Sequence, residues 1–592
     1  MRKYRPARIT GVELHDPVFA PRIDTAIRRT IPACIRKCHD TGRFEAFKLE
    51  WREGMPNKPH IFWDSDVAKV LEGMALALQL RPDAKMEAEL EEYIELIISA
   101  QQPDGYLNIV FSTQHKEERW KNLFNGHELY CAGHLIEAAV AHFETTGRRN
   151  FLECMCRYAD YIATVFGHET NKTHGYPGHE ELELALCKLA EATGERKYFE
   201  LAAYFVNERG QTPNYFTQEQ KVLGEHDLKN RQAHKPVREQ TDADGHAVRA
   251  VYLYSGMADV AAEFNDAELL RACENLWNSI INKRMYITGG IGSTQIGEAF
   301  TVDYNLPNDS AYAESCAAIG LALFAQRMLN ATGEGRYADV MEQILYNNAL
   351  SGISLDGEHF FYANLLEVDD NSFVFNHINK TRQEWFFCSC CPTSYCRFLP
   401  QLGSFICSET DNEIRLNIPA AAQLPNGIEV SSGYPYDGDI RIRFTNGGKY
   451  KFSVHIPGWC GRYTLTLNGM ECGERAVDGY VTFDREWRSG DEIRLILEMP
   501  VRPQYSNRKI TSNAGRIALT RGPLVYALES VDNGKVLPQL VIPAGQEFAL
   551  TEAAGLPEGT VAISGRALQE ENDSDSLYST TPPACHECTF TA

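Results

Sequence analysis

The sequence lacks the features of a membrane or secreted protein. No stretch approaches the roughly 20 consecutive apolar residues that a membrane-spanning helix needs. The first residues, Met1 to Pro6, carry positive charge with no apolar run behind them, unlike a signal peptide. Positive charge is scarce overall, since 58 lysines and arginines stand against 80 aspartates and glutamates, for a net charge of −22. This balance argues against nucleic acid or a membrane as a partner, and we expect a cytoplasmic protein.

Cysteine, by contrast, is abundant, with 17 residues. In a reducing compartment these thiols are not expected to form disulfides, so a cluster of them indicates metal binding or catalysis. Scattered cysteines such as Cys131, Cys187 and Cys273 lie on apolar helical faces and are expected to be small core residues.

From about residue 23 to about residue 405, apolar residues recur with the helical period. The stretch from Ser65 to Leu80 has apolar residues at i, i+3, i+4 and i+7 behind a serine and aspartate cap. We expect further helices over residues 86–100, 127–143, 151–166, 180–192, 198–207, 246–264, 268–281, 312–329 and 337–351.

A short motif links these helices. Thr145–Phe151 recurs as Ala192–Tyr198 and again as Ala331–Tyr337, with the first two copies 47 residues apart. Each copy places a glycine where a helix ends, followed by a polar turn and an aromatic residue that opens the next helix. Repeated hairpins at this period predict a solenoid or a closed ring. A single catalytic loop favours an α/α barrel of about six hairpins, with an open helical array as the alternative.

After about residue 407 the apolar period changes to two, which predicts strands, as in Asp439–Phe444. We therefore expect three domains: a catalytic α/α barrel over residues 1–407, a β-sandwich over 408–505, and a second β-sandwich-like domain over 506–592. The polar stretch from Ala554 to Ser576 predicts a loose loop.

The clustered thiols lie in the segment from Cys388 to Pro392. Adjacent cysteines such as Cys390 and Cys391 rarely bridge each other, because the ring would be strained, but both can hold one metal ion. Glu314 and Cys316, at the start of a predicted helix, offer two more ligands. Two ligands from each of two places suit tetrahedral zinc. Unpaired buried thiols and a purely structural zinc are the alternatives.

A catalytic role for a zinc-bound cysteine follows from thiol chemistry. A free thiol is mostly protonated at neutral pH, whereas zinc deprotonates it, so a zinc-held cysteine can attack an electrophilic carbon. The leaving group then needs a proton from a general acid. Glu298, in the glycine-rich loop that precedes Glu314, is the candidate, although a solvated loop glutamate is the simpler interpretation. That loop is not a nucleotide fingerprint, because the strand–helix context is missing.

Three histidines follow a glycine at a predicted helix start, namely His127, His179 and His246. One such histidine is more often a cap or a core residue, but three on the side where long loops gather predict a pocket for a polar ligand. Tyr362 and Trp385 offer the aromatic and polar contacts that sugars use, with core packing as the simpler role for each.

At these positions the chain resembles glycoside hydrolase family 127, the β-L-arabinofuranosidases. The shared motifs are Tyr286–Gly292, Gly297-Glu298, Tyr312–Cys316, Trp385–Pro392, Ile456–Trp459 and Thr520–Tyr526. The resemblance therefore extends over nearly the whole chain.

The resemblance implies an α/α barrel with β-sandwich domains, and a retaining enzyme that releases L-arabinose from non-reducing terminal β-L-arabinofuranosides. Its substrate would be a small arabinoside or oligosaccharide. Cys390 would be the nucleophile and Glu298 the acid/base. The ligands of Zn²⁺ would be Glu314, Cys316, Cys390 and Cys391, and the sugar contacts would be His127, His179, His246 and Tyr362.

Other interpretations stay open. Related enzymes continue into an aromatic-rich strand that this sequence lacks, so the last β domain is expected to be incomplete, and a homodimer through it is left open. A hydrolase, lyase or epimerase acting on another unusual sugar would keep the fold and use a carboxylate pair, with the zinc purely structural. A non-catalytic carbohydrate-binding or scaffold protein is the third interpretation.

Overall fold

The helical period of the first two thirds of the chain produces a closed ring of helix pairs. The computed structural model describes residues 3–220, 222–370, 372, 374–534, 537–553, 555–557, 559–571 and 576–592. In this part of the chain six inner helices follow one another round the ring, and the last packs against the first. They are α3 (Trp63–Leu80), α6 (Glu128–Thr146), α8 (Leu182–Thr193), α12 (Ala247–Phe264), α14 (Ser315–Thr332) and α16 (Cys390–Phe398).

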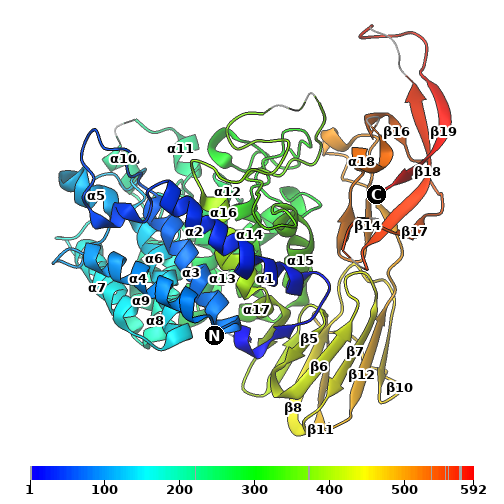
Figure 1. Ribbon diagram of the computed structural model, residues 1–592, viewed down its shortest axis with the longest axis horizontal. Coiled ribbons are helices and arrows are strands. Elements are labelled where there is room, and N and C mark those ends of the chain that lie inside the picture. The colour runs from blue at the N-terminus through cyan, green and yellow to red at the C-terminus, as the bar shows by residue number, and fades with distance from the viewer. Residues whose placement is uncertain are drawn as a thin grey trace.

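Outer helices cover this ring. Each packs on the inner helix before it in the sequence, except that α2 (Ile31–Asp40) closes the gap beside α3 and α16. The others are α4 (Ala84–Ala100), α7 (Asn150–Val165), α9 (Arg196–Glu208), α13 (Ala267–Lys283) and α15 (Gly335–Ile344). The predicted closed α/α barrel is thus confirmed, and it occupies the left half of Figure 1.

Inner and outer helices differ in how much of their surface is buried. α12 is buried on nearly all sides, whereas α13 buries only the stripe that runs through Leu269, Cys273, Leu276 and Ile280. A helix that is apolar all round belongs in a core, and one with a single stripe covers a surface. Among the described residues, no helix has both the length and the apolar character to cross a membrane.

The repeated glycine motif sets the direction of the pairs. Gly147, Gly194 and Gly333 end α6, α8 and α14 with φ of 71°, 74° and 77°. This left-handed conformation is easy for glycine, and Asn265 adopts it at the end of α12. Four of the six inner helices end in such a turn at one end of the barrel, and the N-termini of the inner helices gather at the other end, which we call the mouth.

The period-two region forms two sheets that contact each other. A five-stranded sheet contains β1 (Arg5–Pro6), β3 (Cys407–Glu409), β4 (Glu413–Leu416), β8 (Gly448–His455) and β11 (Tyr480–Trp487). A seven-stranded sheet contains β2 (Glu13–Leu14), β5 (Ala422–Leu424), β6 (Ile428–Ser432), β7 (Asp439–Phe444), β9 (Tyr463–Leu467), β10 (Met470–Glu471) and β12 (Glu492–Leu497). Phe444 of β7 stacks at 3.6 Å on Trp487 of β11, which joins the two sheets. The N-terminal strands β1 and β2 extend one sheet each.

Two smaller sheets follow, at the upper right of Figure 1. One holds β13 (Arg502–Gln504), β14 (Ala518–Arg521) and β15 (Leu524–Tyr526). The other holds β16 (Leu540–Val541), β17 (Ala549–Glu552), β18 (Val561–Glu571) and β19 (Ala584–Thr591).

The predicted loose loop over residues 554–576 is wrong where β18 runs. Strand β18 pairs with β19 along eight residues, from Ser564 opposite Thr591 to Glu571 opposite Ala584. Its side chains are mostly half-buried, so the sequence shows no apolar alternation, while the backbone hydrogen bonds that hold the strand do not depend on side-chain type. Residues 554, 558 and 572–575 of the predicted loop lie outside the described residues.

Candidate active site

The residues singled out in the sequence meet at the mouth of the barrel. His127 is the N-cap of α6, His246 the N-cap of α12 and Glu314 the N-cap of α14, while Cys390 is the first residue of α16. His179 lies three residues before α8 begins. Helix N-termini carry partial positive charge, so this end of the ring favours thiolates and carboxylates.

Glu314, Cys316, Cys390 and Cys391 form one compact group, whose ligand atoms all lie within 4.8 Å of one another. The Cys390 and Cys391 sulfurs each lie 3.6 Å from Oε1 of Glu314 and 3.8 Å from each other. Helix α14 begins at Ser315, three residues later than predicted, so Glu314 is its N-cap and lies outside the helix, within reach of Cys316. Cys388 lies outside this group.

The group fits a metal ion. Its donors are three thiols and a carboxylate, a set that suits zinc, and Oε2 of Glu314 is buried with no hydrogen-bond partner. Burial raises the pKa of both Cys390 and Glu314, and the neighbouring Cys316 raises each further. Burial also disfavours the Cys316 thiolate, but hydrogen bonds from the other two thiols outweigh it and lower its pKa well below the usual value. The buried group alone thus favours one thiolate with protonated neighbours, whereas a divalent cation would displace the remaining protons.

Glu298 lies beside this group and is surrounded by donors. Nδ1 of His246 accepts the backbone N–H of Val248 at 3.2 Å, so the neutral ring carries its proton on Nε2, which lies 2.8 Å from Oε2 of Glu298. The hydroxyl of Tyr312 donates to Oε1 of Glu298 at 2.6 Å. Burial alone would raise the pKa of Glu298, but hydrogen bonds from His246 and His377 bring it well below the usual value. The donors around Glu298 therefore favour its carboxylate form.

The backbone that presents Glu298 is a tight turn. Gly297 has φ of 69° and Glu298 itself has φ of 53°, a left-handed conformation that non-glycine residues seldom adopt. Ala299 bridges both Thr294 and His246, which ties the turn to the start of α12. Gly290 in the same loop serves close packing, because a Cβ at this position would lie 2.6 Å from the Asn348 side chain.

Tyr362 joins the two halves of the site. Its hydroxyl lies 3.1 Å from the Cys390 sulfur and 3.3 Å from Oε1 of Glu298. The ring of His377 stacks on Tyr362 at 3.9 Å, and its Nδ1 lies 3.1 Å from the Tyr312 hydroxyl. No pattern in the sequence singled out His377, which comes from an irregular loop, and Tyr312 was noted only as part of a motif.

The remaining histidines line the same mouth. The ring centroid of His179 lies 5.8 Å from that of His127 and 5.4 Å from that of His246. Burial, followed by the nearby Arg249 guanidinium, lowers the pKa of His127 to about 3 and that of His179 well below its usual value. Nδ1 of His127 donates to the Asn125 carbonyl at 2.6 Å, which leaves Nε2 as an acceptor. Neutral histidines of this kind suit the hydroxyl groups of an uncharged sugar.

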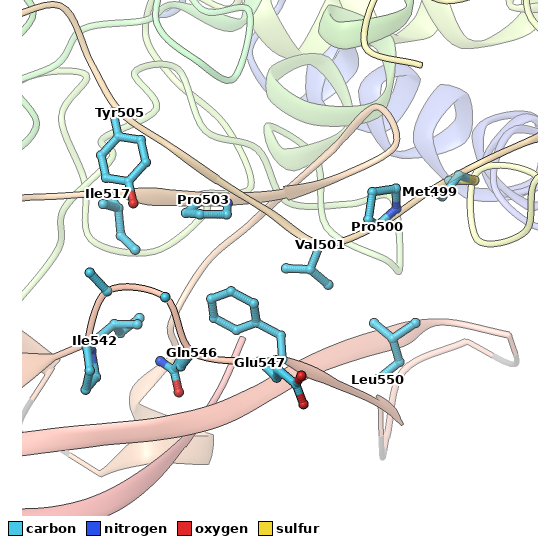
Figure 2. Close-up of a pocket in the computed structure, with 14 residues that line it drawn as sticks. Met499, Pro500, Val501, Pro503, Tyr505, Ile517, Ile542, Gln546, Glu547 and Leu550 are labelled. Atoms are coloured by element: carbon cyan, nitrogen blue, oxygen red, sulfur yellow. The ribbon is translucent and has the colours of Figure 1, made fainter. Parts of the chain in front are cut away.

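A second hollow, unrelated to this chemistry, lies among the C-terminal strands (Figure 2). This groove of about 580 Å³ is lined mainly by apolar side chains from Met499 to Tyr505 and from Ile542 to Leu550. None of the predicted site residues lines it, so the candidate active site is the mouth of the barrel.

Comparison with known proteins identifies the family of the chain. Models of the β-L-arabinofuranosidase GH127 catalytic, middle and C-terminal domains match residues 11–404, 413–499 and 501–564. The chain is 38% identical over 546 residues to a non-reducing end β-L-arabinofuranosidase from Bifidobacterium longum subsp. longum, covering 87% of this chain and 83% of that protein.

Solved structures give the same result. A GH127 β-L-arabinofuranosidase from Geobacillus stearothermophilus T6 is 40% identical with a TM-score of 0.94, over 98% of this chain and 96% of that one. Another GH127 β-arabinofuranosidase is 34% identical with a TM-score of 0.91, over 100% of this chain and 95% of that one. Matches to all three domains and to relatives along most of their length show that the chain belongs to glycoside hydrolase family 127 and is a glycosidase.

Proposed function

We propose that the protein releases L-arabinose from the non-reducing end of β-L-arabinofuranosides, with retention of configuration. The relative from Bifidobacterium longum is a non-reducing end β-L-arabinofuranosidase, and that from Geobacillus stearothermophilus is a β-L-arabinofuranosidase. The observation that carries the mechanism is that the Cys390 sulfur and the Glu298 carboxylate both lie within 3.3 Å of the Tyr362 hydroxyl. A nucleophile and an acid/base this close together can act on the same anomeric centre.

The proposed cofactor is Zn²⁺, held by Glu314, Cys316, Cys390 and Cys391. Bound there, zinc supplies the positive charge that keeps the thiols deprotonated. The chemistry needs reduced thiols, which the cytoplasm maintains, and we propose that location for the protein.

In the first step the Cys390 thiolate attacks the anomeric carbon and forms a C–S bond as the glycosidic C–O bond breaks. Glu298 gives a proton to the leaving oxygen, so the aglycone departs as an alcohol. Glu298 must take up that proton from solvent before this step, and the adjacent Tyr312 hydroxyl and the His246 and His377 rings then hold its carboxyl group in place.

In the second step Glu298, now a carboxylate, takes a proton from water. The resulting hydroxide attacks the anomeric carbon, the C–S bond breaks, and Cys390 leaves again as a thiolate. The donors around Glu298 favour the carboxylate, which is the form this step requires. His127, His179 and His246 are proposed to hold the sugar hydroxyls, since their neutral rings can donate or accept hydrogen bonds.

The test is hydrolysis of p-nitrophenyl furanosides by wild-type protein and by Cys390→Ser, combined with intact-mass measurement during turnover. We expect the β-L-arabinoside to be hydrolysed, and a slow substrate to leave a pentosyl adduct on Cys390. Hydrolysis of a different furanoside, with none of the β-L-arabinoside, would overturn the substrate assignment but not the proposed mechanism.

A second mechanism is favoured by one observation, which is that Glu298 and Glu314 approach within 4.8 Å in a group with His246. Such a carboxylate pair can also run a retaining reaction, with the zinc purely structural. If folded, metal-loaded Cys390→Ser keeps wild-type activity, Glu314 rather than Cys390 is the nucleophile.

A further inference from the structure

A second group of metal-ligating side chains lies outside the active site. Nδ1 of His168 is 3.3 Å from Oε2 of Glu208, and Nδ1 of His174 is 3.6 Å from Oε1 of the same carboxylate. The ligand atoms of the three residues lie within 4.8 Å of one another. We propose that they form a site for a divalent transition-metal ion, which fastens the segment leading to His179.

The distances suit such an ion. Two ligands each about 2.1 Å from a tetrahedral ion lie about 3.4 Å apart. Each histidine nitrogen lies at about that distance from one oxygen of Glu208, His168 from Oε2 and His174 from Oε1. Two imidazoles and a carboxylate are donors that zinc accepts, and a water can complete the set because both rings are exposed.

The charges around Glu208 also call for a cation. Glu208 is the last residue of α9, where the helix carbonyls already create negative potential that repels a carboxylate. Its side chain is only 14% exposed, and within the described residues it forms no ion pair with a lysine or arginine. The neighbouring Lys172 pairs instead with Glu169, and Arg209 turns inward to Glu180 and Glu183. A bound cation would compensate the negative charge of Glu208, which the two histidines compensate only in part.

The frame of the site is held in place. Phe166 and Thr173 bridge, and the Thr173 N–H donates to the Val165 carbonyl at 2.8 Å, which closes the turn that carries His168. The Tyr204 hydroxyl, one turn before Glu208 on α9, donates to the carbonyls of Thr173 and Gly175, on either side of His174. Binding therefore requires little more than side-chain rotation, which keeps its entropic cost low.

The proposed metal site would also affect the mouth of the barrel. His174 is five residues before His179, and Arg209 holds the carbonyl of Pro177 at 2.8 Å between them. A metal ion on His174 and Glu208 would fix one end of a segment whose other end presents His179 to the sugar. This role is structural and does not depend on the chemistry proposed for Cys390.

The test uses Co²⁺ as the probe, in equilibrium dialysis of the full chain. The proteins are wild type, Glu208→Gln, the double variant His168→Asn/His174→Asn, and His115→Asn as a control that removes an exposed histidine elsewhere. We expect the Glu208 and double variants to bind one equivalent less, or with affinity lowered tenfold or more, while the control matches wild type. Equal binding by wild type and the double variant would overturn the site.

A second measurement tests whether the metal ion fastens the segment that leads to His179. Hydrogen exchange of residues 166–178 should slow severalfold on adding Zn²⁺ to wild type and should not change in the double variant. Extra metal binding without this slowing would overturn the proposed role. The sulfur-to-cobalt absorption of the cysteine group should be the same in all four proteins, and its absence would count against the proposed zinc enzyme but not against this site.

Discussion

The hydroxyl of Tyr362 lies 3.1 Å from the sulfur of Cys390, and the same oxygen lies 3.3 Å from Glu298. One buried phenol thus touches both groups to which the reaction is assigned. Because Cys390 comes from α16 and Glu298 from the turn before α14, Tyr362 is the contact that sets their separation.

Tyr362→Phe should therefore impair the reaction more than the fold. Removing a hydrogen bond to a charged group costs about 1.5–3 kcal/mol, so we expect kcat/KM to fall about 10- to 100-fold. The ring and its stacking on His377 remain, so the unfolding temperature should stay within a few degrees of wild type. This is measured by steady-state kinetics on the p-nitrophenyl β-L-arabinoside and by a thermal melt. An unchanged kcat/KM would contradict the bridging role of Tyr362.

Arg43 is the residue that positions the cysteine loop. Its guanidinium donates to the Phe387 carbonyl at 3.0 Å and to the Ser389 hydroxyl at 3.3 Å, and it pairs with buried Asp66 at 2.9 Å. The ring centroids of Trp63 and of Trp385, the latter considered above as a sugar contact, lie 4.9 Å and 5.3 Å from its guanidinium carbon. The two tryptophans thus pack around this cation.

Arg43→Lys keeps the charge but cannot reach all of these partners at once. A displacement of about 1 Å at a reacting group can lower the rate about 100-fold, so we expect a folded enzyme whose kcat falls 10- to 100-fold. Arg43→Met should instead destabilise the protein by about 3–5 kcal/mol, because Asp66 is left buried without a partner. Arg36→Lys, at an exposed arginine nearby, is the control and should match wild type in both kinetics and urea unfolding.

Much of this site and its frame was predictable from the sequence, for identifiable reasons. Helical periodicity and capping glycines are local signals, so the barrel and its direction followed from residues such as Gly147 and Gly194. The group of Glu314, Cys316, Cys390 and Cys391 was visible because Cys390 and Cys391 are adjacent and Glu314 and Cys316 lie two residues apart at the start of one helix. The contacts of His377 depend instead on how an irregular loop folds back, and no sequence spacing encodes that.

The β18 error has a related cause. Strand prediction relies on one apolar face, and β18 places half-buried polar side chains on both faces. Its neighbour β19 is mostly exposed, so neither strand carries the alternation of a half-buried sheet. The two strands are held by their ladder of backbone hydrogen bonds, which the side chains do not reveal.

The barrel and the β region meet at a carboxyl that makes stability depend on pH. Glu342 of α15 is buried, and it accepts hydrogen bonds from Tyr434 at 2.5 Å and Trp459 at 3.0 Å. Burial raises its pKa to about 8, despite those two donors. Between the unfolded pKa of about 4.5 and the folded value, the native state binds the proton more tightly than the unfolded state does.

This group therefore stabilises the fold at low pH and loses its contribution as pH rises from about 5 to about 8, by up to ~1.4 kcal/mol per pH unit. Glu342→Gln should flatten that decline, so its stability relative to wild type improves with rising pH. Urea unfolding at a series of pH values gives the slopes, with Glu117→Gln as an exposed control. Parallel curves for wild type and Glu342→Gln would show that Glu342 does not titrate in this range.

The metal group offers a matched pair of thiols for a last prediction. Cys316 belongs to the four-ligand group, whereas Cys388 lies 3.9 Å from the Tyr362 hydroxyl and outside that group. We expect Cys316→Ala to lower zinc affinity at least 100-fold and to abolish activity, because three ligands then share a site built for four. Cys388→Ala should keep its zinc and lose little activity, although it removes a thiol that also lies beside Tyr362. The two variants are compared by their metal content from atomic absorption, by chelator competition and by kinetics. Loss of zinc from both variants would mean that Cys388 is also a ligand.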